Sequence, residues 1–319
     1  MLGLRLYWAT TSAVVAAVLW GSIGVAVRLA EGAGGSVDVL IVGRALGASI
    51  LSLPILARYR ARLTVWGLAI ALLGLAPLYY TYMKAVSLIG AALASLLLYT
   101  APLWVVILGS MILGERPGIG GLASIALGVT GTALVSGVFN GGLGALDPRG
   151  LVYGLASGVS YALYMILARL AQNRGVGVLE ASLTPVTLTG LILLVAIHPQ
   201  RPPNTVELTA SLYLAGFTVI LPYILHVYAL KHIEAHRVSI ISLIEPVSAV
   251  TLAYLILGER LDRAQLLGAA LIITATLTVN IGRQGKQGKH INDPNNAIDL
   301  DGPNEELSGE ARIACSHKR

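Results

Sequence analysis

The sequence predicts an all-α membrane protein in which ten transmembrane helices form two inverted five-helix repeats. Three observations predict this fold: few charged residues, ten apolar segments of membrane-spanning length, and an internal repeat. The 319 residues are 55% hydrophobic and 12% charged, with a mean hydropathy of +0.76, whereas about 25% of the residues in a soluble domain are charged. A soluble enzyme, a nucleic-acid-binding protein and a disordered chain are therefore excluded.

The apolar segments each approach the roughly 20 residues that a helix needs to cross a bilayer. Charged residues and turn-forming glycines and prolines separate them, and no separating loop is long enough to form an extramembrane domain. The segments lack the alternation of a membrane β-barrel, so helices are the predicted spanning form. We expect these helices at residues 8–30, 37–57, 64–84, 92–113, 119–138, 150–171, 178–197, 208–230, 237–257 and 264–281.

The loops on the side of the N-terminus carry more Lys and Arg than those on the other side, and such loops face the cytoplasm. We therefore expect a multi-pass protein of the cell membrane with both termini in the cytoplasm. Residues 282–319 mix both charges without apolar periodicity and are predicted to form a disordered cytoplasmic tail. The basic loop residues on the N-terminal side are Arg5, Arg58, Arg60, Arg62, Arg116, Arg174, Lys231 and Arg237.

An internal repeat relates the two halves of the chain. A shift of 144 residues aligns 79–135 with 223–279 without a gap and gives 19 identities in 57 pairs, and a shift of 141 places Arg28 on Arg169. Each half, 8–138 and 150–281, therefore has five helices. Because five is odd, the second half crosses the membrane in the opposite direction, as is typical of secondary transporters.

Matching motifs in the two halves carry a family resemblance. They are Leu19-Trp20-Gly21-Ser22, Tyr99-Thr-Ala-Pro102 through Leu113-Gly-Glu-Arg116, and Leu243-Ile-Glu-Pro246 through Leu257-Gly-Glu-Arg260. The sequence resembles the EamA family of the drug/metabolite transporter superfamily. The resemblance implies ten helices around a central cavity and alternating-access transport, often export, of small organic metabolites such as amino acids.

The predicted partners are a small-molecule substrate, the lipid bilayer and protons as a coupling ion, with the protein a monomer or a homodimer. Nucleic acid is not a predicted partner, and no ATP-binding loop, cofactor or metal site is expected. The alternatives are a proton-coupled multidrug exporter and a non-transporting scaffold or sensor. An intramembrane aspartyl protease is not supported, because the aspartates lie in loops or at helix ends, and a serine protease is not supported, because Leu155 stands where its motif needs glycine.

Glu245 is the candidate coupling residue, because a carboxylate near the membrane centre costs about 2.5–3.5 kcal/mol and needs a compensating role. The alternative role is to stabilise the helix break at Pro246. Its repeat partner is Ala101, so either role is asymmetric. Pro102 and Pro246 occupy matching positions within helices, where proline removes a backbone donor, and they are candidate hinges or static kinks.

A set of aromatic and polar residues is predicted to line the cavity, although aromatic side chains also form interfacial belts and helix contacts. Arg44 either contacts an anionic group or extends to the surface, and extension is expected for Arg28 and Arg169. His226 either pairs with Glu245 or packs as a hydrogen-bonded histidine. The cavity candidates are Trp20, Ser22, Arg44, Tyr79, Tyr82, Tyr99, Tyr161, Tyr164 and His226.

The two Gly-Glu-Arg motifs are predicted to be structural. Glycine is common where a helix ends, and glutamate favours the positive N-terminal end of the helix that follows. The motif residues are Gly114, Glu115 and Arg116 in the first half, and Gly258, Glu259 and Arg260 in the second.

Overall fold

The computed structural model describes residues 2–62, 64–138, 147–196 and 201–291, and the regular secondary structure in these ranges is entirely helical. The elements are α1 (Leu2–Gly32), α2 (Val37–Arg58), α3 (Val65–Ala69), η1 (Ile70–Leu75), α4 (Ala76–Leu98), α5 (Ala101–Ile112), α6 (Ile119–Val135), α7 (Pro148–Asn173), α8 (Val178–Ala196), α9 (Thr205–Tyr213), η2 (Leu214–Ile220), α10 (Leu221–His232), α11 (Ala235–Ser242), α12 (Ile244–Leu257) and α13 (Arg263–Ile291). The symbol η marks a π-helical segment.

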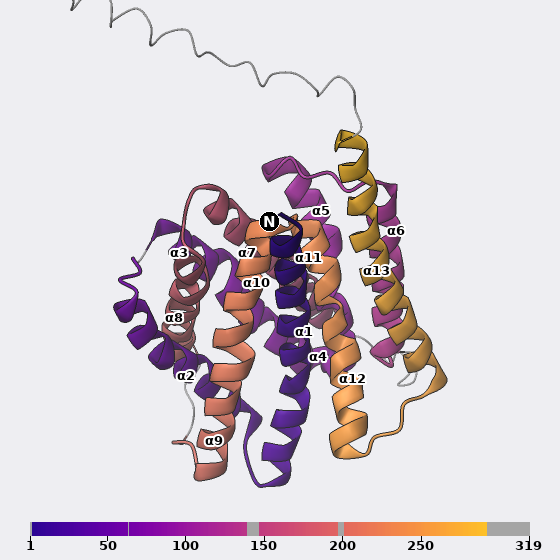
Figure 1. Cartoon of the computed structure of the whole chain (residues 1–319). Helices are drawn as coiled ribbons and strands as arrows, with labels where there is room; N and C mark the ends of the chain where they lie inside the picture. Colours follow the sequence, from indigo (N-terminus) through magenta and orange to yellow (C-terminus); the bar gives the residue numbers. More distant parts are fainter. Residues whose placement is uncertain (1, 63, 139–146, 197–200, 292–319) are drawn as a thin grey trace, which may run out of the picture. The chain divides into compact units, whose positions relative to one another are not determined.

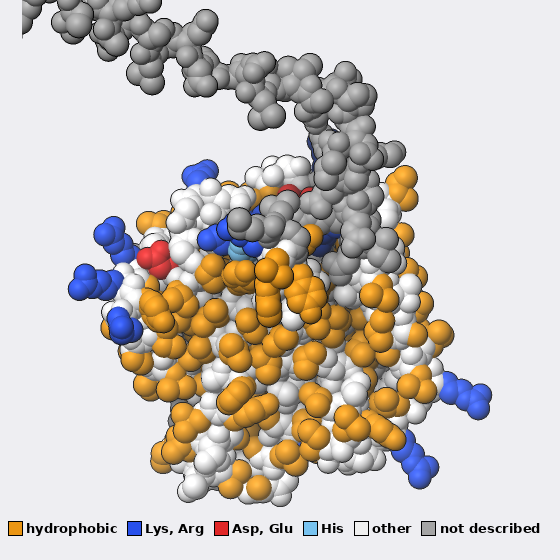
Figure 2. Space-filling view, in the orientation of Figure 1, with side chains coloured by type: hydrophobic (Ala, Val, Ile, Leu, Met, Phe, Trp, Pro, Cys, Tyr) orange, Lys and Arg blue, Asp and Glu red, His pale blue; other side chains and the backbone are white. Residues whose placement is uncertain are grey.

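Eight helical stretches are long and apolar enough to cross a membrane, and Ile119–Val135 and Arg263–Val279 are shorter apolar helices. The face in Figure 2 is covered by hydrophobic side chains, with Lys and Arg at its edges. The protein is therefore a multi-pass membrane protein. Helix α13 continues to Ile291, into the first part of the predicted tail, and residues 292–319 lie outside the described residues.

Breaks in the helices recur at matching positions in the two halves. The π-helical segments η1 and η2 begin at Ile70 and Leu214, which are 144 positions apart. The regular helix also ends at Leu98 and at Ser242, again 144 positions apart. In each half a proline follows within the first turn of the next helix, where its fixed φ is tolerated.

The packing of the helices follows the same repeat. Helix α1 contacts α10 and α12 of the second half and runs between them in Figure 1, while α7 contacts α4 and α5 of the first half. Helices α2 and α8 also pack together. Each half thus supplies one helix, α1 or α7, to the interior of the other half.

Two polar contacts identify the two ends of this bundle. The Arg62 amide donates to Glu180 at 3.0 Å, which joins the end of α2 to the start of α8. The Ser36 amide donates to Glu207 at 2.7 Å, which joins the start of α2 to the start of α9. We call the first end, where α1 begins, the N-terminal end, and the second the opposite end.

Candidate functional site

An aromatic cluster occupies the interior between α1, α7 and α10. Trp20 lies 5.5 Å from Tyr223 and 5.1 Å from His226, measured between ring centres. Tyr161 and Tyr164 stack at 6.1 Å, and Tyr164 is completely buried. Trp20, Tyr161 and Tyr164 therefore lie together in the interior, and their role as a substrate-cavity lining stays a prediction.

His226 forms part of the packing of this cluster. Its Nδ1 lies 3.0 Å from the Tyr164 hydroxyl, and its Nε2 lies 3.1 Å from the Ser242 hydroxyl. Both ring nitrogens are used by these hydroxyls, so the pairing of His226 with Glu245 that the sequence allowed is not formed. The structure instead has the alternative, a hydrogen-bonded packing histidine.

Arg44, on α2, points toward the interior rather than to the surface. Its Nη2 donates to the Tyr79 hydroxyl at 2.9 Å, and its guanidinium carbon lies 5.0 Å from the centre of the Tyr79 ring. The Tyr79 hydroxyl lies 3.2 Å from that of Tyr223, the residue 144 positions later. These two repeat partners meet, so any two-fold axis relating the halves passes near them.

Glu245, in the first turn of α12, faces the same interior cluster. The Tyr99 hydroxyl and the Arg44 guanidinium lie within electrostatic range of its carboxyl. Tyr82 and Tyr161 also lie within the field of its charge, and the Tyr82 hydroxyl is 2.9 Å from that of Ser95.

The guanidinium of Arg44 and the carboxyl of Glu245 form no ion pair with each other, nor with any other residue in the described ranges. The Tyr161 hydroxyl is buried nearby without a hydrogen-bond partner among the described residues. The cluster therefore contains one positive group and one negative group among aromatic rings.

A cavity of about 520 Å³ lies between α1, α9 and α12, toward the opposite end. Of the predicted cavity residues, Ser22 lines it and the others do not, and the Ser22 hydroxyl lies 2.9 Å from that of Tyr213. The sequence analysis missed Tyr213, although it is spaced i,i+4 from Phe217, which it stacks against at 5.4 Å. The other lining residues are Val25, Ala26, Leu29, Ala30, Val206, Thr209, Ala210, Leu252 and Ile256.

Pro102 and Pro246 stand at helix breaks, and a glycine of a central helix contacts each break. A Cβ atom on Gly21 of α1 would lie 2.9 Å from the Glu245 carbonyl oxygen, and one on Gly158 of α7 would lie 2.8 Å from that of Leu97. Only glycine allows so close an approach without displacement of the backbone. The predicted kinks are therefore present, and α1 and α7 pack directly on them.

The glycines of the two Gly-Glu-Arg motifs end their helices as predicted. Gly114 and Gly258 have φ values of 69° and 70°, in the left-handed region that favours glycine at this position. Arg116 and Arg260 are exposed.

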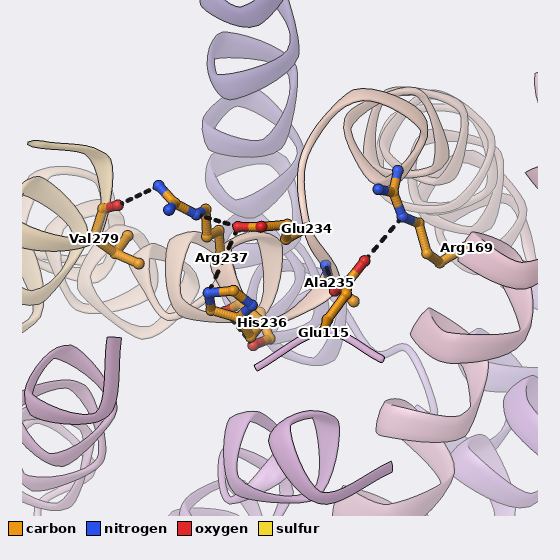
Figure 3. Close-up of polar contacts among 8 residues, drawn as sticks. Glu115, Arg169, Glu234, Ala235, His236, Arg237 and Val279 are labelled. Carbon is orange, nitrogen blue, oxygen red and sulfur yellow. Dashed lines mark hydrogen bonds and ion pairs between the residues drawn. The ribbon is translucent and has the colours of Figure 1, made fainter. Parts of the chain in front are cut away.

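The glutamates of these motifs do not have the local role that was predicted. Glu115 pairs with Arg169 of α7 at 3.1 Å and accepts from the Ala235 amide at 2.7 Å, so it contacts the second half rather than the next helix (Figure 3). Burial raises the pKa of the Glu115 carboxyl, and the Ala235 amide and Arg169 oppose this shift. Glu259 pairs with Arg28 of α1. Both glutamates therefore bridge the two halves.

Arg28 reaches the exterior as expected, with 61% of its side chain exposed, but Arg169 is only 17% exposed. The expected extension of Arg169 to the surface is wrong, because its Nη1 also donates to the Leu230 carbonyl at 2.5 Å.

Comparison with known proteins adds an independent line of evidence. An uncharacterized transporter of Archaeoglobus fulgidus is 30% identical over 272 residues, which cover 83% of this chain and 93% of that protein. A probable amino-acid metabolite efflux pump of Salmonella typhimurium is 32% identical over 204 residues, 60% of this chain and 67% of that protein. Its Escherichia coli counterpart, described in the same words, is 31% identical over 204 residues.

A solved crystal structure shares the fold, with a TM-score of 0.73 at 20% identity over 88% of this chain and 98% of the other. The sequence model of the EamA-like transporter family matches twice, at residues 7–137 and 148–281. These matches cover both halves and nearly all of the described helices. The chain therefore belongs to the EamA-like transporter family.

Proposed function

We propose that this protein is a secondary transporter that exports amino-acid-like metabolites across the cell membrane by alternating access, without ATP. Ten helices form two inverted five-helix repeats, with both termini in the cytoplasm. Helix α6 and the apolar part of α13, Arg263–Val279, complete the ten. The repeated breaks, the exchange of α1 and α7 between halves and the two family matches support this arrangement.

The main support for this substrate class is that Arg44 and Glu245 face the same interior cluster but form no ion pair with each other. An α-amino acid carries a carboxylate and an ammonium group a few ångströms apart. The carboxylate would take the free donors of Arg44, and the ammonium would pair with Glu245. Charge-assisted hydrogen bonds of this kind are the stronger ones in proteins, and the surrounding aromatic rings accommodate an apolar side chain and attract the cation.

The relatives support the same class of substrate, because two of them are described as probable amino-acid metabolite efflux pumps. The alternative, a proton-coupled multidrug exporter, requires a carboxyl that exchanges protons. Glu245 is the residue that would serve it, and the same experiment separates the two functions.

The test is counterflow in proteoliposomes that hold the full-length chain. Vesicles are loaded with leucine, with 4-methylpentanoate, which lacks the ammonium group, or with 3-methylbutylamine, which lacks the carboxylate. We expect exchange of leucine and little exchange of either analogue. Exchange of the amine alone would favour the multidrug exporter and overturn the zwitterion site. No flux of any compound through folded protein would favour the scaffold or sensor.

Glu245→Gln then separates substrate binding from proton coupling, with Glu31→Gln at the exposed end of α1 as the matched control. If Glu245 only binds the ammonium group, the variant loses leucine exchange at every pH. If it carries a proton, the variant loses acceleration by a pH gradient but retains exchange at equal pH.

A further inference from the structure

The two cross-repeat ion pairs are related by the internal repeat. Arg28 and Arg169 are 141 positions apart, and Glu115 and Glu259 are 144 positions apart. In each pair an arginine near the end of the half's first long helix binds the glutamate of the other half's Gly-Glu-Arg motif. One pair lies at the N-terminal end and the other at the opposite end.

The environments of the two pairs differ strongly in this structure. At the N-terminal end the side chains of Arg169 and Glu115 are 17% and 13% exposed, whereas at the opposite end those of Arg28 and Glu259 are 61% and 42% exposed. Arg169 and Glu115 also bind the Leu230 carbonyl and the Ala235 amide. In the described ranges the side chains of Arg28 and Glu259 make no contact of that kind.

The cavity between α1, α9 and α12 lies on the side of the exposed pair, and it includes Leu29, next to Arg28. The buried pair and the cavity thus lie toward different ends. In this structure the ion pair at the N-terminal end is the buried one, and the ion pair at the opposite end is the exposed one.

We propose that the Arg169–Glu115 and Arg28–Glu259 pairs are reciprocal latches, each of which is buried only when its own end of the transporter is closed. This proposal rests on the alternating-access function above. A two-fold operation that exchanges the halves exchanges the two pairs, so the state closed at the opposite end has Arg28–Glu259 buried and Arg169–Glu115 exposed.

The repeat also identifies the backbone groups that would complete the second latch. The counterpart of Ala235 is Ala91, an identical residue that follows the kink at Gly90, where φ is 79°. The counterpart of Leu230 is Val86. In the alternate state, Glu259 accepts from the Ala91 amide, and Arg28 donates to the Val86 carbonyl.

The energetic consequence is that the two glutamates act on the conformational equilibrium with opposite signs. When one partner of an ion pair is neutralised, a buried and fully hydrogen-bonded pair loses much more stabilising free energy than an exposed pair does. Neutralising Glu115 therefore destabilises the present state, and neutralising Glu259 destabilises the alternate state. We expect each single change to shift the ratio of states by about tenfold, in opposite directions. The two effects should cancel in the double variant, because the sites are distant.

The test measures both ends with spin labels in proteoliposomes containing the full-length chain. After Cys315→Ser, cysteines at Ala33 and Arg263 report the opposite end, and cysteines at the repeat-equivalent Arg174 and Ile119 report the N-terminal end. Glu115→Gln should lengthen the Arg174–Ile119 distance and shorten the Ala33–Arg263 distance. Glu259→Gln should have the reverse effect, and Glu115→Gln/Glu259→Gln should restore the original populations.

The control is Asp147→Asn, which weakens an exposed ion pair with Arg149 at the start of one helix and should leave both distance distributions unchanged. Shifts in the same direction for both glutamate variants, or no shift in either, would overturn the latches. Leucine counterflow by the same samples separates the two proposals. If the variants transport leucine and their distance distributions do not change, the latches alone are refuted. If the unmutated chain shows neither leucine flux nor a second set of distances, transport itself is refuted.

Discussion

In the first half of the molecule the interior charge is Arg44 on α2, and in the second half it is Glu245 on α12. Neither has a charged counterpart, because the matching positions hold Pro185 and Ala101. The helix breaks, the prolines after them, the π-helical segments and the cross-repeat ion pairs do occur in both halves. The elements suited to motion are thus repeated, while the groups suited to bind a substrate occur once.

The difference follows from what each part must do. Inward-open and outward-open states of similar energy require equivalent mechanical parts in both halves. The amino-acid-like substrate that we propose has one carboxylate and one ammonium group, so a second copy of Arg44 or Glu245 would leave an unpaired charge in the membrane interior.

The largest effect is expected from Arg44→Ala compared with Pro185→Ala at the repeat-equivalent position. Loss of one partner of a buried, charged hydrogen bond costs about 2–5 kcal/mol, so leucine flux at low concentration should fall by about 100-fold or more in the Arg44 variant. Pro185→Ala should retain most of the flux. Equal losses in the two variants would show that position 44 is no more specialised than its counterpart.

A large effect of another kind is expected at the crossing of α6 and α13. A Cβ atom on Gly268 would lie 2.5 Å from the Gly131 carbonyl oxygen, so Gly268→Val should lower the free energy of unfolding by about 1–3 kcal/mol. Flux per folded molecule should fall less than in Arg44→Ala, because the atoms that the new side chain meets belong to Gly131, Leu134 and Val135 and not to Arg44 or Glu245. Gly120→Val is the control, since a Cβ atom there meets no atom within 4 Å.

Much of this arrangement could be predicted from the sequence. Hydropathy located eight helices that are long enough to span a membrane and two shorter apolar helices, and the shift of 144 placed the two prolines at matching positions, where the structure has helix breaks. Apolar segments are recognised from their composition and length, and a repeated feature occurs at two matching positions in the one sequence. The shift of 144 also made Tyr79 and Tyr223 equivalent, and their hydroxyls meet in the structure, a contact that equivalence alone does not predict.

Contacts between the halves could not be predicted in the same way. Glu115 was assigned to the helix that follows it, because helix-end rules describe only neighbours in the chain, whereas its partners Arg169 and Ala235 lie in the other half. The sequence suggested Glu245 as a partner of His226, but the His226 ring on α10 instead contacts the hydroxyls of Tyr164 and Ser242.

Removing the hydroxyl of Tyr79 or of its repeat partner Tyr223 should have a smaller effect on leucine flux, and the size of the effect should differ between the two residues. Tyr79→Phe removes the acceptor of the Arg44 hydrogen bond as well as the contact with Tyr223, whereas Tyr223→Phe removes only the second of these. We expect the concentration for half-maximal leucine flux to rise by about tenfold for Tyr79→Phe and by about threefold or less for Tyr223→Phe, since hydrogen bonds to charged groups are worth more than neutral ones. The reverse order would show that Arg44 is held by other contacts.

The smallest effect, and the most direct test of equivalence, comes from Pro102→Ala and Pro246→Ala. Each change releases the fixed φ of a residue just after a break, and the N–H that it adds lies in the first helical turn, where amides have no intrahelical partner. If both breaks must bend during the cycle, each variant should slow leucine exchange by about threefold and leave the half-maximal concentration unchanged. Pro54→Ala, within α2, is the matched control for loss of a proline inside a helix. A loss confined to Pro246→Ala would instead connect that break to its neighbour Glu245, and it would mean that the second half has a mechanical role that the first half lacks.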